Sequence, residues 1–324
     1  MKTSDILEKN ILAILTIARL APSVHNTQPW LVHRDSDSLV IKIDSQHQLR
    51  DGDPTGRQTT IGLGIFCEAL AIAANNFELR LKSLSLEHSV TRLVFVASPV
   101  SRATPEQTKL LKTRSSDRSI YKPTAIDRTV VSKLEACSTK NKTTVIVSTD
   151  ATIRMLVADL TGKAINVALS SPGFRNELSQ YLVIKGSRKQ RGIAVGSLYI
   201  NPLIAQLQPF MLRHGINIGA EAKLEKLRWE SASGLVLIIA PGDVPKYWIE
   251  AGRSYLRASL EIEAAGLSQA TSAGIVEASN YHEDIEEALH TGERLLAVIR
   301  IGKGSPERRY SPRVLAAALL TEST

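Results

Sequence analysis

The stretch "ARLAPSVHNTQPW", residues 18–30, places hydrogen-bonding side chains and two prolines directly after an amphipathic helix. Apolar residues recur at helical spacing over about 5–20, and Ser4 can act as the N-cap of this predicted helix. Pro22 cannot continue the helix, so the stretch is the loop that leaves it. A strand is predicted to follow from Trp30.

This loop has two possible roles. Ser23 and Asn26 are short polar side chains on a segment that the prolines constrain, which suits the recognition of a flat ligand rich in hydrogen-bonding groups. The same residues could cap the helix and form an Asx-turn. We interpret His25 and Gln28 as structural in either case.

Length and composition predict a chain of two lobes with an aliphatic core. The chain has 324 residues, of which 43% are hydrophobic and only 5% aromatic. Cys67 and Cys137 lie in apolar helical patterns without metal-like partners, which favours a reduced protein. No apolar run is long enough to span a bilayer, and charged residues precede any apolar region at the N-terminus. We therefore expect a cytoplasmic protein without a membrane partner.

Several functional classes find little support in the sequence. The net charge is +8, but the basic residues are scattered and match no nucleic-acid-binding motif. The histidines and acidic residues lack metal-like spacing, so we expect no metal site. A nucleophile elbow, a P-loop and a dinucleotide fingerprint are missing as well. The chemistry is therefore predicted to depend on a bound cofactor, with no protein catalytic residue. A basic nucleic-acid-binding protein stays the outside alternative.

Strands and helices alternate twice along the chain, which predicts an α+β protein with two related lobes and a cleft between them. A polar patch at 101–105 marks the expected boundary between an N-terminal half, 1–100, and a C-terminal half, 101–324. Gly62 and Gly64 lie in a buried helix and allow another backbone to approach closely. Residues 185–220 have weak periodicity and much Gly, Pro and Arg, and we interpret them as a lid.

Two arginine-rich segments could bind a phosphate group. In "TRSSDRSIY", residues 113–121, Arg114, Ser116 and Arg118 alternate, so in an extended chain they point the same way. A solvated linker between the lobes is equally compatible with this segment. The segment "GKGSPERRYSPR", residues 302–313, follows the last predicted strand and could be a second phosphate clamp or a basic surface tail.

Taken together, these motifs resemble a known family. "APSVHNTQPW" is similar to the A-P-S-x-x-N-x-Q-P-W signature of the FMN-dependent nitroreductases, and "RSSDR" resembles their R-x-S-x-R/K phosphate segment. In ordinary members the R-x-S segment comes first and two subunits build each site. The reversed order in this chain resembles the Acg-like branch, in which one chain carries two nitroreductase-like halves and mimics the dimer. The resemblance implies a nitroreductase-like fold in pseudo-dimeric form.

The resemblance also implies a set of cofactor-binding residues. Those of the opening loop would contact the flavin ring and its ribityl chain, and they are Pro22, Ser23 and Asn26. Those of the R-x-S segment would bind the phosphate and the pyrimidine side of the ring, with Arg118 as the cation that favours the reduced flavin; they are Arg114, Ser116 and Arg118. Arg313, with Arg309, would close on the phosphate from the C-terminus. Backbone N–H groups would be offered to the flavin by Gly266, Leu267 and Ser268.

The implied function is an NAD(P)H-dependent FMN oxidoreductase that reduces nitro compounds or quinones in a ping-pong reaction. The second half's counterpart of the loop, "LSSPGFRNELSQYL", has lost the N-x-Q-P-W, so we expect one FMN per chain. The chain could function as a monomer because it mimics a dimer. The alternative is a flavoprotein of weak activity that sequesters FMN beneath the lid at 185–220.

Overall fold

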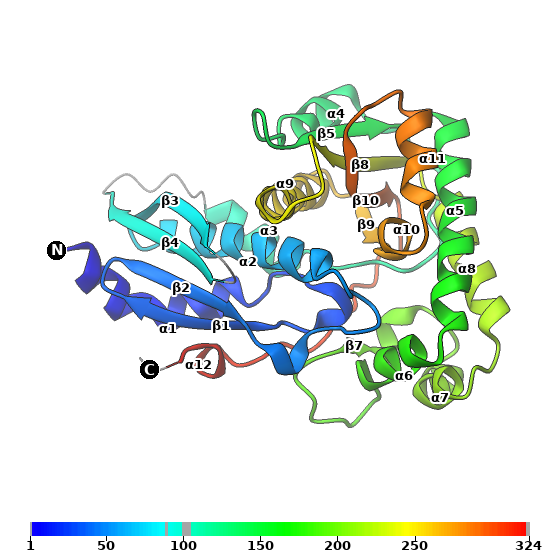
Figure 1. Ribbon diagram of the computed structural model, residues 1–324, viewed down its shortest axis with the longest axis horizontal. Coiled ribbons are helices and arrows are strands. Elements are labelled where there is room, and N and C mark those ends of the chain that lie inside the picture. The colour runs from blue at the N-terminus through cyan, green and yellow to red at the C-terminus, as the bar shows by residue number, and fades with distance from the viewer. Residues whose placement is uncertain (1, 88–89, 99–104, 322–324) are drawn as a thin grey trace.

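The computed structural model describes residues 2–87, 90–98 and 105–321. It is an α+β structure with two four-stranded antiparallel sheets that lie on opposite sides of a central pair of helices (Figure 1). We call residues 2–98 the first lobe and residues 105–321 the second lobe. The predicted boundary at 101–105 falls outside the described residues, apart from Pro105 at the start of a helix.

The first lobe holds the sheet with strand order β1-β2-β4-β3, in which all neighbours are antiparallel. Its strands are β1 (Trp30–Asp35), β2 (Ser38–Ile43), β3 (Leu79–Glu87) and β4 (Val90–Ala97). Its helices are α1 (Thr3–Ala18) and α2 (Arg57–Asn75). The predicted N-terminal helix and the predicted strand at Trp30 are both present, but the N-cap of α1 is Lys2 and Ser4 lies inside the helix. Strand β3 was not predicted from the sequence.

The second lobe repeats this topology. Its sheet has the order β5-β8-β10-β9, again antiparallel throughout. Its strands are β5 (Thr144–Ser148), β8 (Gly234–Ala240), β9 (Ser268–Thr271) and β10 (Arg294–Gly302). Numbered within their own lobe, the strands of both sheets run in the order 1-2-4-3, and a long helix joins strands 2 and 3 in each. This shared order confirms two related lobes within one chain, the pseudo-dimeric arrangement.

The remaining helices belong to the second lobe and to the C-terminus. They are α3 (Pro105–Thr113), α4 (Arg128–Glu135), α5 (Ala151–Ser170), α6 (Pro172–Gln180), α7 (Pro202–Arg213), α8 (Ile218–Glu230), α9 (Pro245–Ala264), α10 (Gly274–Glu277), α11 (Tyr281–Ala288) and α12 (Ala316–Leu319). None of the helices among the described residues is long and apolar enough to cross a membrane.

Strand β8 shows how the second sheet is covered on both faces. Every residue of this strand is buried. Val236 and Ile238 pack into the large core cluster that contains α9, whereas Leu235 and Leu237 pack into a second cluster with α5 and α11. Successive side chains of a strand point to opposite faces, so the continuous apolar run is explained by helices on either side.

Helices α2 and α9 pack against each other between the two sheets. The large core cluster includes side chains of both helices and of both sheets, so the lobes share one continuous core. A Cβ built on Gly64 would overlap the backbone of Ile249, and one built on Gly252 would overlap the carbonyl oxygen of Ile61. The close approach predicted from Gly64 is therefore confirmed. Gly62 does not lie at this contact, since its nearest neighbour is Ser23 at 3.8 Å.

The chain between β5 and β8 contains α5 to α8, and it includes the irregular part of the sequence. Residues 185–220, interpreted from the sequence as a lid, contain regular structure. They include α7 and the short strand β7 (Ile193–Ala194), which pairs in parallel with β6 (Leu182–Val183), just before the segment. Side chains of this segment form a small apolar cluster with Leu169 of α5. We call residues 171–230 the insertion.

Candidate functional site

The loop of the opening stretch has an unusual backbone. After α1 it forms one 3-10 turn, Val24–Asn26, and three non-glycine residues adopt positive φ: His25 (47°), Asn26 (55°) and Gln28 (48°). Such conformations are uncommon outside glycine and persist where surrounding contacts hold them. The backbone N–H of Gln28 donates to Ser23 Oγ at 2.9 Å across the turn. This loop is therefore more than a simple helix cap.

Two side chains of the loop fasten it to distant parts of the chain. Asn26 Nδ2 donates to the carbonyl oxygens of Gly192 and Pro312, both at 2.8 Å, and Asn26 Oδ1 accepts from Arg313. Gln28 Nε2 donates to a backbone carbonyl of the insertion at 3.0 Å, and its Oε1 accepts from the N–H of Val314 at 2.9 Å. Gln28 is structural as expected. The side-chain amide of Asn26 likewise forms its hydrogen bonds with other parts of the protein.

The C-terminal segment reaches the loop because it returns from the second lobe to the first. After β10 the chain runs back beneath the first sheet and ends in α12 beside α1 (Figure 1). Leu320 forms a parallel bridge with Val32 of β1. This path carries Arg309 and Arg313 past the loop, although almost 290 residues separate them from it in sequence.

A small pocket of about 70 Å³ forms where these segments meet. It brings together residues from the opening loop, from the segment after α3 and from the C-terminal segment. Eight of the residues predicted for the cofactor line it, and they are Pro22, Ser23, Asn26, Arg114, Ser116, Arg118, Arg309 and Arg313. The arginine-rich segment is therefore part of a pocket wall and not a solvated linker.

The pocket concentrates positive charge, and two of its arginines, Arg114 and Arg313, form no ion pair with a described residue. Arg114 is buried, and its Nε and Nη1 atoms have no hydrogen-bond partner among the described residues. The Nε of Arg313 is also buried without a partner. Burial lowers the pKa of Arg114, and burial together with the charges of Arg114 and Arg19 lowers the pKa of Arg313 to about 9. Buried donors of this kind fit an anion with several oxygen acceptors, such as a phosphate monoester.

Arg309 differs from these two arginines. Its guanidinium donates to the carbonyl oxygen of Gly196 at 2.7 Å, pairs with Glu307 at 2.7 Å and lies 4.4 Å from the ring centroid of Tyr199. It therefore forms part of the pocket wall with its donors already engaged. Neighbouring Arg308 is paired in the same way, with Glu263 at 3.0 Å.

A larger cavity of about 490 Å³ adjoins the small pocket, and the two share Pro22, Ser23, His25, Ser116, Arg118 and Ile193 in their walls. Most of its remaining wall is apolar. Helix α2 contributes Ile61 and Ile65, and the insertion contributes Phe174, Leu198 and Leu212. A cavity of this size and character suits a flat, largely apolar ligand.

Arg118 lies where the two spaces join. Burial lowers its pKa, and although Glu225 acts in the opposite direction, Arg228 and Arg300 add to the decrease. No hydrogen bond or ion pair joins Arg118 to another described residue, so its guanidinium is available to a ligand. Arg118 can therefore supply positive charge at the junction.

Arg300 supports the backbone around Arg118, a role that the sequence analysis missed. It is fully buried, donates to the carbonyl oxygens of Asp117 at 3.1 Å and Ser119 at 2.9 Å, and lies 3.9 Å from the ring centroid of Tyr121. An arginine in the middle of an apolar last strand was the available signal. Its hydrogen bonds hold the backbone on both sides of Arg118.

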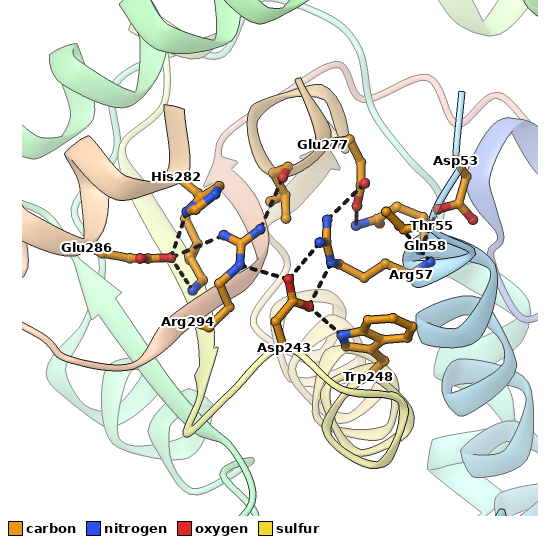
Figure 2. Close-up of polar contacts among 12 residues, drawn as sticks. Asp53, Thr55, Arg57, Gln58, Asp243, Trp248, Glu277, His282, Glu286 and Arg294 are labelled. Atoms are coloured by element: carbon orange, nitrogen blue, oxygen red, sulfur yellow. Dashed lines mark hydrogen bonds and ion pairs between the residues drawn. The ribbon is translucent and has the colours of Figure 1, made fainter. Parts of the chain in front are cut away.

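An ion-pair network joins the two lobes beside the cavity. Figure 2 shows Arg57 between Glu277 and Asp243, with Arg294 on the other side of Asp243. Arg57 lies 2.9 Å from Glu277 and 2.6 Å from Asp243, and Trp248 Nε1 donates to Asp243 at 2.6 Å. Because Glu277 also borders the cavity, this network neutralises a carboxylate that would otherwise face the ligand.

His25 borders both spaces, although the sequence analysis treated it as structural. Its ring makes an edge contact with Phe174 at 6.0 Å between centroids, and its Nδ1 is buried without a partner among the described residues. Burial, with a smaller contribution from Arg118, lowers the pKa of His25 to about 4. The imidazole is therefore neutral at physiological pH.

This shift predicts a pH dependence of stability. The unfolded chain binds a proton below pH 6.5 and the folded chain does not, so the stabilisation from His25 is complete above that pH and is lost as pH falls towards 4. When the pH is lowered from about 7 to about 5, the free energy of unfolding of the FMN-free wild type should fall. This fall should exceed that of FMN-free His25→Asn by about 1–2 kcal/mol. Urea titrations at both pH values measure the difference. His290→Asn is the control, since His290 is exposed and also has positive φ; an equal effect there would contradict the assignment.

The predicted contribution of Gly266, Leu267 and Ser268 is not supported by their positions. None of the three lines either space. The N–H of Gly266 donates to Glu263 and that of Leu267 to Ile262, so both are used in ending α9. Leu267 packs in the core, and Ser268 begins β9. Residues three to six positions further on reach the cavity instead, and they are Thr271, Ser272, Ala273 and Gly274.

The described part of the chain contains neither a cluster of metal-ligand residues nor a cysteine that lines the pocket or the cavity. No group of three or more potential ligand residues lies close enough to hold a metal ion there. Cys67 and Cys137 are both free and buried, and burial raises the pKa of each thiol. Neither cysteine lines the pocket or the cavity.

Comparison with known proteins finds nitroreductases. No protein-family profile matches the chain. Among curated proteins, the probable NAD(P)H nitroreductase PigM of Serratia sp. is 39% identical over 70 residues, which is 21% of this chain and 20% of that protein. The putative NAD(P)H nitroreductase Rv3131 of Mycobacterium tuberculosis is 35% identical over 65 residues, 20% of this chain and 19% of that protein. The chain thus matches about one fifth of the length of these curated relatives. The sequence match confirms the resemblance to the nitroreductase family.

The solved structures that the chain resembles carry related names. The FMN-dependent nitroreductase NfnB of Mycobacterium smegmatis, solved with NADPH, has a TM-score of 0.39 and 17% identity over 62% of this chain and 88% of that chain. The FMN and NADPH-dependent nitroreductase NfnB of a Sphigopyxis strain has a TM-score of 0.39 and 16% identity over 64% of this chain and 94% of that chain.

Proposed function

We propose that the chain is an FMN-binding oxidoreductase of the nitroreductase type that takes reducing equivalents from NAD(P)H. The observation that carries this proposal is the pairing of two spaces. A small pocket with partnerless buried guanidinium donors adjoins a largely apolar cavity of about 490 Å³. A phosphate group joined to a flat aromatic ring system needs both, and the sequence match to NAD(P)H nitroreductases points the same way.

In this proposal the residues of the site have separate tasks. Arg114 and Arg313 bind the phosphate, and the hydroxyl groups of Ser23 and Ser116 add donors beside it. Arg118 places positive charge at the junction, where it stabilises negative charge on a reduced ring. When bound, FMN supplies hydride transfer, from NAD(P)H and on to an acceptor. The apolar wall of the cavity excludes water, and nothing in the site requires a protein acid or base.

The finer parts of the proposal follow from the chain's organisation. Because only the first loop keeps the complete motif, we propose one FMN per chain, and because both lobes belong to one chain, a monomer would suffice. The acceptor would be a small molecule such as a nitro compound or a quinone, reduced in a ping-pong reaction. Membership of the Acg-like branch, a cytoplasmic location and the absence of a nucleic-acid partner are part of the same proposal.

A second candidate function is supported by the position of the insertion. Leu198, Ile200 and Leu212 of the insertion form part of the cavity wall, so a bound ligand would be covered on that side. A covered flavin is less open to alternating visits by NAD(P)H and an acceptor. The alternative is thus a protein that sequesters FMN and turns over slowly.

The test uses the absorbance and turnover of the purified protein. We expect the spectrum of bound oxidised flavin at a ratio of one FMN per chain, and NADPH oxidation that depends on added menadione or a nitrofuran. A folded but colourless protein that does not take up added FMN would overturn FMN binding. Full FMN occupancy with no turnover would favour the sequestering function. A colourless protein whose DNA affinity falls with salt would support the nucleic-acid alternative.

A further inference from the structure

The insertion contains a long run without acidic residues. From Leu178 to Ala220 the sequence has no Asp or Glu, although the whole chain has 32 of these residues. The run contains five basic residues, which are Lys185, Arg188, Lys189, Arg191 and Arg213. Arg191 faces Asp44 at 3.7 Å, but the other four are exposed and form no ion pair with a described residue. This part of the molecule therefore carries uncompensated positive charge.

Helix α7 in the same run has an apolar face that is open to solvent. Leu203 is 79% exposed, Leu207 57% and Phe210 59%, and their spacing of four and three residues places them along one side of the helix. Ile204 of the same helix, Ile184 before it and Ile216 after it are exposed as well. Single exposed apolar side chains are ordinary, whereas a row of this kind on one helix marks an interaction surface.

Lys185 and Arg213 adjoin this helix, and Arg188 and Lys189 follow Lys185 in the same exposed loop. The backbone N–H of Lys185 donates to Gln206 of α7 at 3.0 Å, which fixes the loop 184–190 against the helix. Arg213 ends the same helix. Helix α7 lies at the edge of the molecule that is remote from the first sheet (Figure 1).

The acidic groups on the elements next to α7 are already engaged. Glu221 accepts from Gln208 at 2.6 Å, and the carboxylate of Glu177 accepts from the backbone N–H groups of residues 50–52. We call the apolar face of α7 together with Lys185, Arg188, Lys189 and Arg213 the α7 surface.

We propose that the α7 surface docks onto an anionic lipid surface, with its apolar side chains in the interfacial layer and its cations against the headgroups. A helix that lies in a membrane interface combines an apolar face with flanking lysines and arginines, as this one does. A second copy of the chain fits less well, because symmetric contact of two α7 surfaces would bring cations against cations. This docking is distinct from spanning a bilayer, which no described helix is long and apolar enough to do.

The position of α7 connects this surface with the cavity. The buried face of the helix carries Ala205, Gln208 and Leu212, and the last two border the cavity. The same helix thus has the cavity on one side and the α7 surface on the other. A molecule dissolved in the lipid would meet the protein close to its cavity. The docking itself does not depend on the proposed oxidoreductase function.

Co-sedimentation of the purified full chain with lipid vesicles tests the proposal. We expect binding to vesicles of phosphatidylcholine with phosphatidylglycerol, weaker binding to phosphatidylcholine alone, and a loss of binding at high salt, since salt screens the headgroup charge. The variant Leu207→Gln/Phe210→Gln and the variant Lys185→Gln/Arg188→Gln should each lower the apparent affinity about 10-fold or more.

Matched controls are available elsewhere on the surface. Leu12→Gln/Met155→Gln removes two exposed apolar side chains from α1 and α5, and Lys82→Gln/Lys140→Gln removes two exposed cations. Both should bind vesicles like the wild type. Absence of vesicle binding by the wild type would overturn the proposal, as would an equal loss in the controls. A third outcome would also overturn it: the wild type forms a dimer and binds no vesicles, and Leu207→Gln/Phe210→Gln converts the dimer to a monomer. The α7 surface would then be a contact between two copies of the chain.

Discussion

Arg114→Ala should yield a folded protein that purifies with little flavin, with the dissociation constant for added FMN raised about 100-fold. Two of its side-chain nitrogens are buried without a partner in the described structure, so a phosphate would receive donors that the chain does not otherwise use. Charge-assisted hydrogen bonds of this kind contribute roughly 1.5–3 kcal/mol each. Flavin content from absorbance and FMN titration of the FMN-free protein measure the change.

The stability of the FMN-free variant separates a binding role from a structural one. A buried charge without a partner costs free energy, so its removal should leave the free energy of unfolding unchanged or higher. Arg128→Ala is the control, because Arg128 is exposed at the start of α4 and should change neither quantity. Normal flavin content in Arg114→Ala would contradict the placement of the phosphate. Unfolding of the FMN-free variant would show that Arg114 is structural.

The parts of the pocket that were predictable from the sequence are those built from side chains in a recognisable pattern, namely the loop after α1 and the alternating residues of the arginine-rich segment. Five polar residues between two prolines in a short loop indicated a constrained conformation, and the positive φ angles there agree. Alternation predicted that Arg114, Ser116 and Arg118 share one wall, and all three line the small pocket. The geometry left Asn26 engaged with the protein itself, which a sequence motif cannot show.

Backbone groups were predicted less well than side chains. Gly266 and Leu267 were expected to offer N–H groups to the flavin, but both N–H groups end α9. A helix that stops at a glycine with positive φ normally uses these groups for its own last turn, and Gly266 has a φ of 67°. That rule was available from the sequence and gives the better prediction.

The elements that were missed have weak patterns of their own. Strand β9 has four residues, and β3 is largely exposed, so neither shows a continuous apolar run. Helix α8 packs against α5 but has only three buried residues, Ala222, Arg228 and Trp229, which leaves little periodicity to detect. The insertion forms an apolar wall of the cavity through tertiary packing. Phe174 and Leu212 meet in this wall only in the folded structure, so the sequence pattern does not reveal it.

The repeat of strand order in the two sheets makes one contact decisive for the fold, namely the crossing of α2 and α9. Gly64 and Gly252 lie at this crossing, where each faces the backbone of the other helix. A methyl group at either position must push the helices apart, and the large core cluster extends through both of them. Separation of the helices would therefore loosen the packing of both lobes at once.

Gly252→Ala should accordingly lower the free energy of unfolding by about 3 kcal/mol or more, because overpacking against rigid backbone cannot be relieved by a rotamer change. Gly62→Ala is the matched control on α2, since its Cβ would have only an ordinary contact, 3.8 Å from Ser23. That variant should gain about 0.5–1 kcal/mol, as alanine favours a helix interior over glycine. Urea unfolding followed by circular dichroism measures both. Equal stability of the two variants would mean that α2 and α9 do not approach each other at Gly252, and the shared core between the lobes would then have to be rejected.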